Sequence, residues 1–311
     1  MQNNLAFVFP GQGSQSLAML ADFAEHDVVQ NTFTEASEAL GYDLWQLIQQ
    51  GPVEKLNETN FTQPALLTAS VAIWRLWQSS TSASPAILAG HSLGEYSALV
   101  CAGVFSLADA VKLVEKRGEF MQVSVPAGTG AMYAIIGLAD DKIIEACQQA
   151  AQGEVVSAVN FNSPGQVVIA GNKAAVERAG ALCKEAGAKR ALPLPVSVPS
   201  HCALMKDAAD KLAEEFNNIT FNKPTISVVN NVDVAIEDSA QAIKTALIKQ
   251  LYSPVRWTET IQYLASNGVE QAIEAGPGKV LQGLLKRIDK TINCQSVNDS
   301  ASLAKALETV E

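Results

Sequence analysis

A serine between two glycines constrains the fold of this chain more than any other feature. The segment Gly90-His91-Ser92-Leu93-Gly94 follows the apolar run 86–89 and precedes a small-residue helical pattern over 93–104. This order is typical of a nucleophile elbow, a sharp strand-to-helix turn that exposes the serine hydroxyl and aims backbone N–H groups at a reacting carbonyl. Glycine fits on both sides because a side chain there would collide with the neighbouring backbone. The segment therefore predicts an α/β domain with a nucleophilic serine.

The remaining pattern indicates two structural units. Alternating helices and strands flank the elbow, and we expect them at 4–9, 22–40, 63–78, 204–217, 225–230, 239–251, 257–267 and 269–274. Between them the order changes to strand, helix, strand, strand, helix, strand, at 132–137, 140–151, 155–160, 166–170, 173–186 and 190–194. That order is the βαββαβ, or ferredoxin-like, unit. We predict a large parallel-sheet domain, residues 1–126 and 198–311, interrupted by a small subdomain, residues 127–197.

Composition excludes several classes of protein. A chain of 311 residues that is 48% hydrophobic buries a large core. No apolar span approaches 18 residues, which argues against a membrane helix, and the apolar run Leu5–Phe9 is too short for a signal peptide. Five cysteines without C-x-x-C spacing suggest neither a disulfide framework nor a metal site, and they favour a reducing cytoplasm. The net charge of −10 argues against a nucleic-acid partner.

A serine hydroxyl needs a base within hydrogen-bond reach, most often histidine, and the chain has 3 histidines. His26 lies beside Glu25 and Asp27 in the first expected helix, as on a solvated helix face. His91 adjoins the nucleophile, but neighbouring side chains diverge at a sharp turn. His201 lies on the loop that returns from the small subdomain, and we predict that it is the base.

The other parts of a hydrolytic site are less typical. No acidic residue between the serine and His201 lies at an obvious strand end, so a backbone carbonyl is the alternative group to orient the imidazole. A second oxyanion donor must come from another strand end. The turn Pro10-Gly11-Gln12-Gly13-Ser14-Gln15 follows the first strand and offers N–H groups, although it lacks the spacing of a phosphate loop.

Arg117, in the segment 113–118, offers a guanidinium suited to a bidentate grip on a carboxylate. The alternative is an ordinary surface cation.

Motifs along nearly the whole chain together resemble one family. They are Phe9-Pro10-Gly11-Gln12-Gly13-Ser14-Gln15, Gln63-Pro64-Ala65, Gly90-His91-Ser92-Leu93-Gly94-Glu95-Tyr96, Arg117-Gly118, Gly130-Ala131-Met132, Asn160-Phe161-Asn162-Ser163-Pro164-Gly165-Gln166, Ser200-His201 and Glu274-Ala275-Gly276-Pro277-Gly278. The set resembles the malonyl-CoA:acyl-carrier-protein transacylases of fatty acid synthesis and the related acyltransferase domains of polyketide synthases. The resemblance implies an α/β fold in which a hydrolase-like parallel-sheet core carries a ferredoxin-like insertion.

The resemblance also implies a role for each matching catalytic residue. Ser92 is expected to be the acylated nucleophile and His201 its base, with the N–H groups of Gln12 and Leu93 as the oxyanion hole. The main-chain carbonyl of Gln250 is expected to orient the histidine.

For binding, the resemblance implies that Arg117 holds the free carboxylate of a malonyl group and that Gln12 also contacts the substrate. Asn160 and Asn162 are expected to line the cleft. The implied substrates are malonyl-CoA and phosphopantetheinyl acyl carrier protein, with no permanently bound cofactor. One departure is Tyr133, where relatives more usually have a small residue, and we expect it to reshape the cleft side of the small subdomain.

Three alternatives remain open at this point. A polyketide-pathway acyltransferase would accept methylmalonyl or broader acyl groups. A serine thioesterase would use the same elbow with an acidic third member. A docking module for acyl carrier protein would not need Ser92 and His201 together. In either a transferase or a docking module, the basic pairs Lys189-Arg190 and Lys286-Arg287 are candidates for docking the acidic carrier, and the alternative is that they are ordinary solvated charges.

Overall fold

The computed structural model describes residues 2–196 and 198–310, and its larger sheet has five parallel strands. The strand order is β7-β2-β1-β8-β9, and the strands are β1 (Gln2–Phe9), β2 (Pro85–Gly90), β7 (Ser227–Val229), β8 (Gln271–Ala275) and β9 (Asn293–Val297). The expected boundaries at residues 1, 197 and 311 lie outside the described residues.

Strand β1 runs through the centre of this sheet and is buried on both faces. Phe7 packs on one face, where it meets the rings of Trp74 and Trp77 edge-on at 5.0 and 5.1 Å between centroids. Ala6 and Val8 face a separate apolar cluster on the other side. Such two-sided burial explains why the segment reads as a nearly continuous apolar run.

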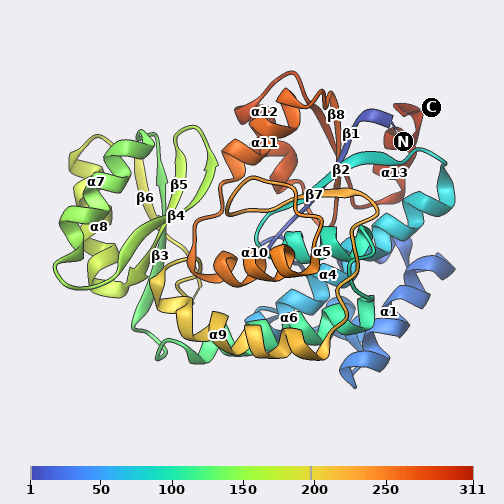
Figure 1. Cartoon of the computed structure of the whole chain (residues 1–311), viewed down its shortest axis with the longest axis horizontal. Helices are drawn as coiled ribbons and strands as arrows, with labels where there is room; N and C mark the ends of the chain where they lie inside the picture. The colour runs from blue at the N-terminus through green and yellow to red at the C-terminus, as the bar shows by residue number, and fades with distance from the viewer. Residues whose placement is uncertain (1, 197, 311) are drawn as a thin grey trace.

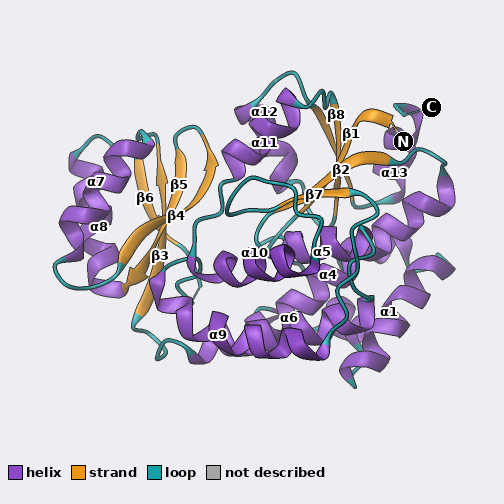
Figure 2. Ribbon diagram, viewed as in Figure 1, coloured by secondary structure: helices purple, strands orange, loops and turns teal. Residues whose placement is uncertain are grey.

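Helices cover both faces of the larger sheet (Figures 1 and 2). One face carries α11 (Trp257–Ser266) and α12 (Val280–Ile288). The other packs against α4 (Thr59–Ser80), α5 (Leu93–Cys101) and α6 (Leu107–Val123). The remaining helices of this part are α1 (Asp27–Leu40), α2 (Leu44–Gln50), α3 (Val53–Leu56), α9 (Lys206–Glu215), α10 (Ala240–Tyr252) and α13 (Ser300–Glu308).

The small subdomain is a separate four-stranded antiparallel sheet, on the left in Figure 1. Its elements are β3 (Gly130–Ile136), α7 (Asp140–Ala151), β4 (Val156–Ser163), β5 (Gln166–Asn172), α8 (Lys173–Glu185) and β6 (Arg190–Pro193). The order β4-β5-β3-β6, with antiparallel pairs throughout, is the ferredoxin-like arrangement. Helices α7 and α8 cover one face, and the other face packs on Cys202 of the larger part.

The expectation for Tyr133 was wrong. Successive side chains of a strand point to opposite faces, so Met132 faces the cleft while Tyr133 packs among the residues under α7 and α8. Gly180 of α8 leaves room for the ring, because a Cβ there would lie 3.1 Å from it.

Several expected element boundaries also differ. The helix expected at 22–40 is a 3-10 turn, Ala21–Phe23, followed by α1, and His26 between them is extended with φ −87° and ψ 113°. His26 therefore precedes the helix, with its ring against Phe23. The elbow helix ends at Cys101, since Gly103 adopts a φ of 76° that breaks the helix. Strand β9 and helices α12 and α13 lie beyond the last expected strand.

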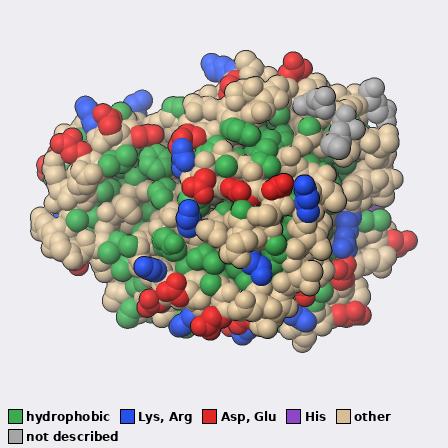
Figure 3. All heavy atoms as spheres, viewed as in Figure 1, with side chains coloured by type: hydrophobic (Ala, Val, Ile, Leu, Met, Phe, Trp, Pro, Cys, Tyr) green, Lys and Arg blue, Asp and Glu red, His purple; other side chains and the backbone are tan. Residues whose placement is uncertain are grey.

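Within the described residues, no helix has the length and apolarity needed to cross a membrane. The five cysteines are free thiols, and four of them are buried. The face shown in Figure 3 mixes positive and negative side chains with apolar ones between them.

Candidate active site

The nucleophile elbow lies where β2 ends at Gly90 and α5 begins at Leu93. Ser92 has φ 53° and ψ −109°, a conformation that non-glycine residues rarely adopt. Both glycines are required sterically. A Cβ on Gly90 would overlap the backbone of Gly94, and one on Gly94 would overlap the carbonyl of Phe9.

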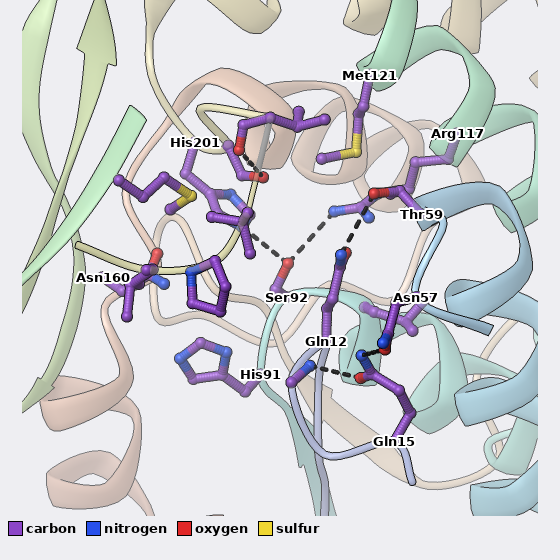
Figure 4. Close-up of a pocket in the computed structure, with 18 residues that line it drawn as sticks. Gln12, Gln15, Asn57, Thr59, His91, Ser92, Arg117, Met121, Asn160 and His201 are labelled. Atoms are coloured by element: carbon purple, nitrogen blue, oxygen red, sulfur yellow. Dashed lines mark hydrogen bonds between the residues drawn. The ribbon is translucent and has the colours of Figure 1, made fainter. Parts of the chain in front are cut away.

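His201 contacts the serine directly. Its Nε2 lies 2.8 Å from Ser92 Oγ, as the dashed line in Figure 4 shows. Its Nδ1 lies 2.7 Å from the main-chain oxygen of Gln250. A carbonyl only accepts, so Nδ1 carries the proton and Nε2 is free to accept one from the serine. The left-handed backbone of His201, with φ 64°, is held by its own N–H, which donates to Leu251 O at 3.0 Å.

The electrostatic surroundings keep His201 neutral. Burial and then the positive charge of Arg117 lower the pKa of His201 to about 3. An imidazole with so low a pKa is unprotonated at neutral pH, which is the form that a general base needs.

Arg117 lies inside the site, only 1% exposed, and is therefore no surface cation. Its Nη1 donates to Gln63 Oε1 at 2.7 Å, and its Nη2 donates to Gln250 Oε1 at 3.0 Å and to Ser92 Oγ at 3.4 Å. Among the described residues no carboxylate forms an ion pair with it. A buried guanidinium with neutral partners beside a nucleophile is suited to bind an anionic substrate group.

The glycine-rich turn after β1 forms the opposite wall. Gly13 N–H donates to Gln15 Oε1 at 2.8 Å, and Gln15 Nε2 donates to Asn57 Oδ1 at 2.9 Å. Gln12 Nε2 reaches Thr59 Oγ1 at 3.3 Å (Figure 4). In the described part of the chain, the backbone N–H groups of Gln12 and Leu93 donate to no protein acceptor.

These groups surround a cavity of about 580 Å³, within the range of roughly 300–1,000 Å³ typical of ligand pockets. Ser92, His201, Arg117, Gln12 and Leu93 all line it. The small subdomain contributes Met132 and Asn160, and the loop after β6 contributes Leu194, Pro195 and Val196.

One expected cleft residue, Asn162, lies outside the cavity, and the other two histidines take no part in the Ser92–His201 pair. Asn162 does not line the cavity, and its Oδ1 accepts from His91 Nε2 at 2.8 Å. His91 lies at the cavity edge, points away from the Ser92–His201 pair in Figure 4, and packs edge-on against Trp257 at 5.5 Å. His26 is outside the site altogether.

Sequence reasoning missed two residues beneath the nucleophile. Asn231 accepts the Ser92 N–H at 2.7 Å and donates to Gly90 O at 2.6 Å, so one carboxamide spans the elbow. Glu95 accepts from Asn231 N at 2.9 Å and from Gln250 Nε2 at 2.8 Å. The available signals were the place of Glu95 within the elbow motif and the pair Asn230-Asn231 directly after an apolar strand.

Comparisons with known proteins agree with this geometry. The model of the acyl transferase domain family matches residues 6–305. The chain belongs to this family. It is 66% identical over 304 residues to the malonyl CoA-acyl carrier protein transacylase of Escherichia coli K12, covering 97% of this chain and 98% of that one. The family predicted from the motifs is therefore confirmed.

Two solved structures show the same fold. An acyl carrier protein S-malonyltransferase from Vibrio cholerae matches with a TM-score of 0.96 and 68% identity, over 97% of this chain and 99% of that one. A malonyl-transacylase solved in complex with its type II PKS acyl-carrier protein matches with a TM-score of 0.97 and 64% identity, over 98% of this chain and 99% of that one. The predicted α/β fold with an antiparallel insertion is confirmed.

Proposed function

We propose that this protein transfers the malonyl group of malonyl-CoA to the phosphopantetheine thiol of acyl carrier protein, supplying extender units for fatty acid synthesis. One observation carries the proposal. The Ser92–His201 pair opens into a cavity in which the buried Arg117 guanidinium lies 3.4 Å from the nucleophilic oxygen. A nucleophile and a carboxylate receptor at this separation suit an acyl group that has a second, free carboxylate.

In the first half-reaction, Ser92 Oγ attacks the thioester carbonyl as its proton passes to His201 Nε2. The N–H groups of Gln12 and Leu93 hold the oxyanion of the tetrahedral intermediate. As the intermediate collapses, His201 returns the proton to the departing CoA thiol. Malonyl-Ser92 and free CoA result.

In the second half-reaction, the carrier thiol gives its proton to His201 and its sulfur attacks malonyl-Ser92. The ester bond breaks, the proton passes to Ser92 Oγ, and malonyl-carrier leaves. Both halves use one base and one oxyanion hole, so they require no cofactor beyond the two substrates, the CoA thioester and the carrier thiol. The partner is acyl carrier protein, and we place the reaction in the cytoplasm, where free thiols such as those of this chain persist.

Binding of the acyl group rests on Arg117, which pins the malonyl carboxylate. Gln12 contacts the acyl group from the turn after β1, and Asn160 faces it from the small subdomain. The carbonyl of Gln250 orients His201. A carbonyl stabilises an imidazolium less than a carboxylate does, and this suffices for an activated thioester. The use of a carbonyl to orient the histidine favours the transferase over a thioesterase with an acidic third member.

Intact-protein mass spectrometry tests the proposal. After brief mixing with malonyl-CoA, the wild-type mass rises by one malonyl group, and the adduct is absent in Ser92→Ala. Holo acyl carrier protein then removes the adduct and gains the same mass. Arg117→Ala should form about 10- to 100-fold less malonyl adduct than the wild type, since a hydrogen bond to a charged group contributes about 1.5–3 kcal/mol. The same variant should form the acetyl adduct at least as well as the wild type.

The same experiment separates the alternatives. Loss of the adduct to water without transfer would indicate a thioesterase. No adduct with any thioester would indicate a docking module. Equal loss of malonyl and acetyl adducts in Arg117→Ala would show that Arg117 does not recognise the carboxylate.

A further inference from the structure

Glu95 is a buried acid next to the site for which the proposed mechanism has no use. It lies in the first turn of α5, three residues after the nucleophile, and is 2% exposed. Gln250 connects it to the reacting groups, because Gln250 Nε2 donates both to Glu95 Oε2, at 2.8 Å, and to Ser92 O, at 3.0 Å. Gln250 Oε1 accepts from Arg117 at 3.0 Å. Glu95 and Arg117 thus lie on opposite sides of one carboxamide.

The two oxygens of Glu95 have different surroundings. Oε2 accepts both hydrogen bonds, from Gln250 Nε2 and from Asn231 N–H. In the described part of the chain, Oε1 accepts none. A proton can therefore bind to Oε1 while both hydrogen bonds to Oε2 persist, so protonation leaves the geometry around Gln250 in place.

A small void lies beside the Glu95 side chain. The void has about 10 Å³, near the least volume of roughly 10–15 Å³ that holds a water molecule. It is lined by Glu95, Asn230 and Glu237 together with apolar side chains. The Asn230 Nδ2 beside it is buried without a partner in the described part of the chain.

Opposing effects act on the ionisation of Glu95 in the free site. Burial raises the pKa of Glu95 to about 7, although the hydrogen bonds and Arg117 act in the opposite direction. Asp233 raises this pKa as well, and Lys249 lies 3.9 Å from Asp233. The ionisable groups that face Glu95 from the surrounding elements are Tyr96, Arg117, Asp233 and Glu237.

Substrate binding upsets this balance. An ionised Glu95 offsets the charge of Arg117 in the free site, so a malonyl carboxylate adds a second anion for a single buried cation. An uncompensated buried charge is costly, and a group with a shifted pKa neutralises instead. An acetyl group brings no such charge.

We propose that Glu95 is a positioning residue that takes up a proton when a carboxylated acyl group occupies Arg117, so that the buried site keeps its charge balance while Gln250 stays in place. The inference rests on the proposed function, because it needs the substrate carboxylate on Arg117. The bound carboxylate raises the pKa of Glu95, so malonyl binding is strongest below the free-enzyme pKa and weakens as pH rises through it, by at most about tenfold per pH unit for one proton.

Calorimetry on Ser92→Ala, which binds thioesters without acyl transfer, measures this proton directly. Malonyl-CoA and acetyl-CoA are titrated in two buffers that differ in ionisation enthalpy, one pH unit above the Glu95 pKa. The protein is expected to take up more protons on binding malonyl-CoA than on binding acetyl-CoA. The difference should lie between zero and one proton. Equal proton uptake for the two thioesters overturns the inference.

Glu95→Gln in the same background isolates the charge, because one amide oxygen can accept both hydrogen bonds now made to Oε2. The extra uptake should vanish, and the affinity for malonyl-CoA should no longer depend on pH. Glu237→Gln removes another carboxylate that lines the void, and as the matched control it should keep the uptake. Uptake that survives in Glu95→Gln, or disappears in Glu237→Gln, overturns the assignment.

Two further arms complete the test. If Glu95→Gln does not fold, Glu95→Asp replaces it, and its uptake must shift to a different pH; an unchanged midpoint overturns the inference. The mass-spectrometric adduct on wild-type protein reports the proposed function separately. An adduct without differential proton uptake rejects the role of Glu95 alone, whereas a missing adduct rejects the function.

Discussion

At the scale of single residues, the site combines a neutral base with a buried cation. Arg117 lowers the pKa of His201 and also faces the nucleophile. One guanidinium therefore has two effects, because it keeps the base unprotonated and offers a receptor for an anion. The hydrogen bond from His201 Nδ1 to a carbonyl fixes the tautomer without adding a negative charge that would raise the histidine pKa.

The first prediction concerns the pH dependence of acylation. An ordinary histidine protonates below pH 6.5 and is lost as a base, but the pKa of His201 is lowered to about 3. With the uncharged acetyl-CoA as substrate, kcat/KM should therefore show no acid limb near pH 6.5. Arg117→Met removes one cause of the lowered pKa and should shift an acid limb upward, towards neutral pH.

Stopped-flow measurement of CoA release across pH checks this prediction. Arg75→Met, which removes an arginine paired with Glu35 away from the site, is the control and should leave the profile unchanged. An acid limb near pH 6.5 in the wild type would show that His201 is more solvated than the structure indicates.

At the scale of elements, the elbow was predictable because its strand, its serine between two glycines and its helix follow one another directly in sequence. The positions of Gly90 and Gly94 follow from contacts with each other and with the end of β1. The contacts of Glu95 and Asn231 were not predictable, because they join distant parts of the sequence. Asn231 lies 136 residues from Glu95 and 139 residues from Ser92. The break at His26 was missed because helical periodicity continues across it, and nothing local marks the extended residue.

Helix α6 approaches α4 closely at Gly118, next to Arg117. A Cβ there would lie 2.5 Å from Asn60 Cα, so Gly118→Ala should destabilise the protein by about 1–3 kcal/mol and displace Arg117. Gly283 in α12 has no atom within 4 Å of its added Cβ. Gly283→Ala should instead stabilise by about 0.5–1 kcal/mol. Denaturant unfolding measures both, and equal shifts of the two midpoints would refute the close helix contact.

At the scale of the whole molecule, each of the two sheets has a core of its own, and the two parts also contact each other. The contacts include backbone hydrogen bonds from Phe161 N to Val255 O, at 3.0 Å, and from Val255 N to Val159 O, at 2.8 Å. Arg287 of α12 also donates to Gln166 of β5. The basic pairs considered for carrier docking lie at the start of β6 and in the last turn of α12, and their role in docking stays a prediction.

We propose that residues 127–197 unfold separately from residues 1–126 and 198–311. Ile169 is fully buried in the small-subdomain core, so Ile169→Ala should cost about 2–5 kcal/mol. Amide hydrogen exchange should then lose protection in β3, β4 and β5 while β1 and β8 stay protected. Ile273→Ala in β8 is the matched control and should give the reverse pattern. Loss of protection throughout the chain in both variants would indicate a single cooperative unit.

The path of the chain through the site has a consequence for how such proteins diversify. The nucleophile lies before the inserted sheet and its base follows it, yet both belong to the larger part of the molecule. Among the described residues, the insertion contributes Met132, Asn160 and the adjoining loop to the cavity wall. Recombination between relatives at the two crossing points would exchange one wall of the acyl chamber and leave the reacting groups intact. One wall of the chamber can therefore be inherited separately from Ser92, His201 and Arg117.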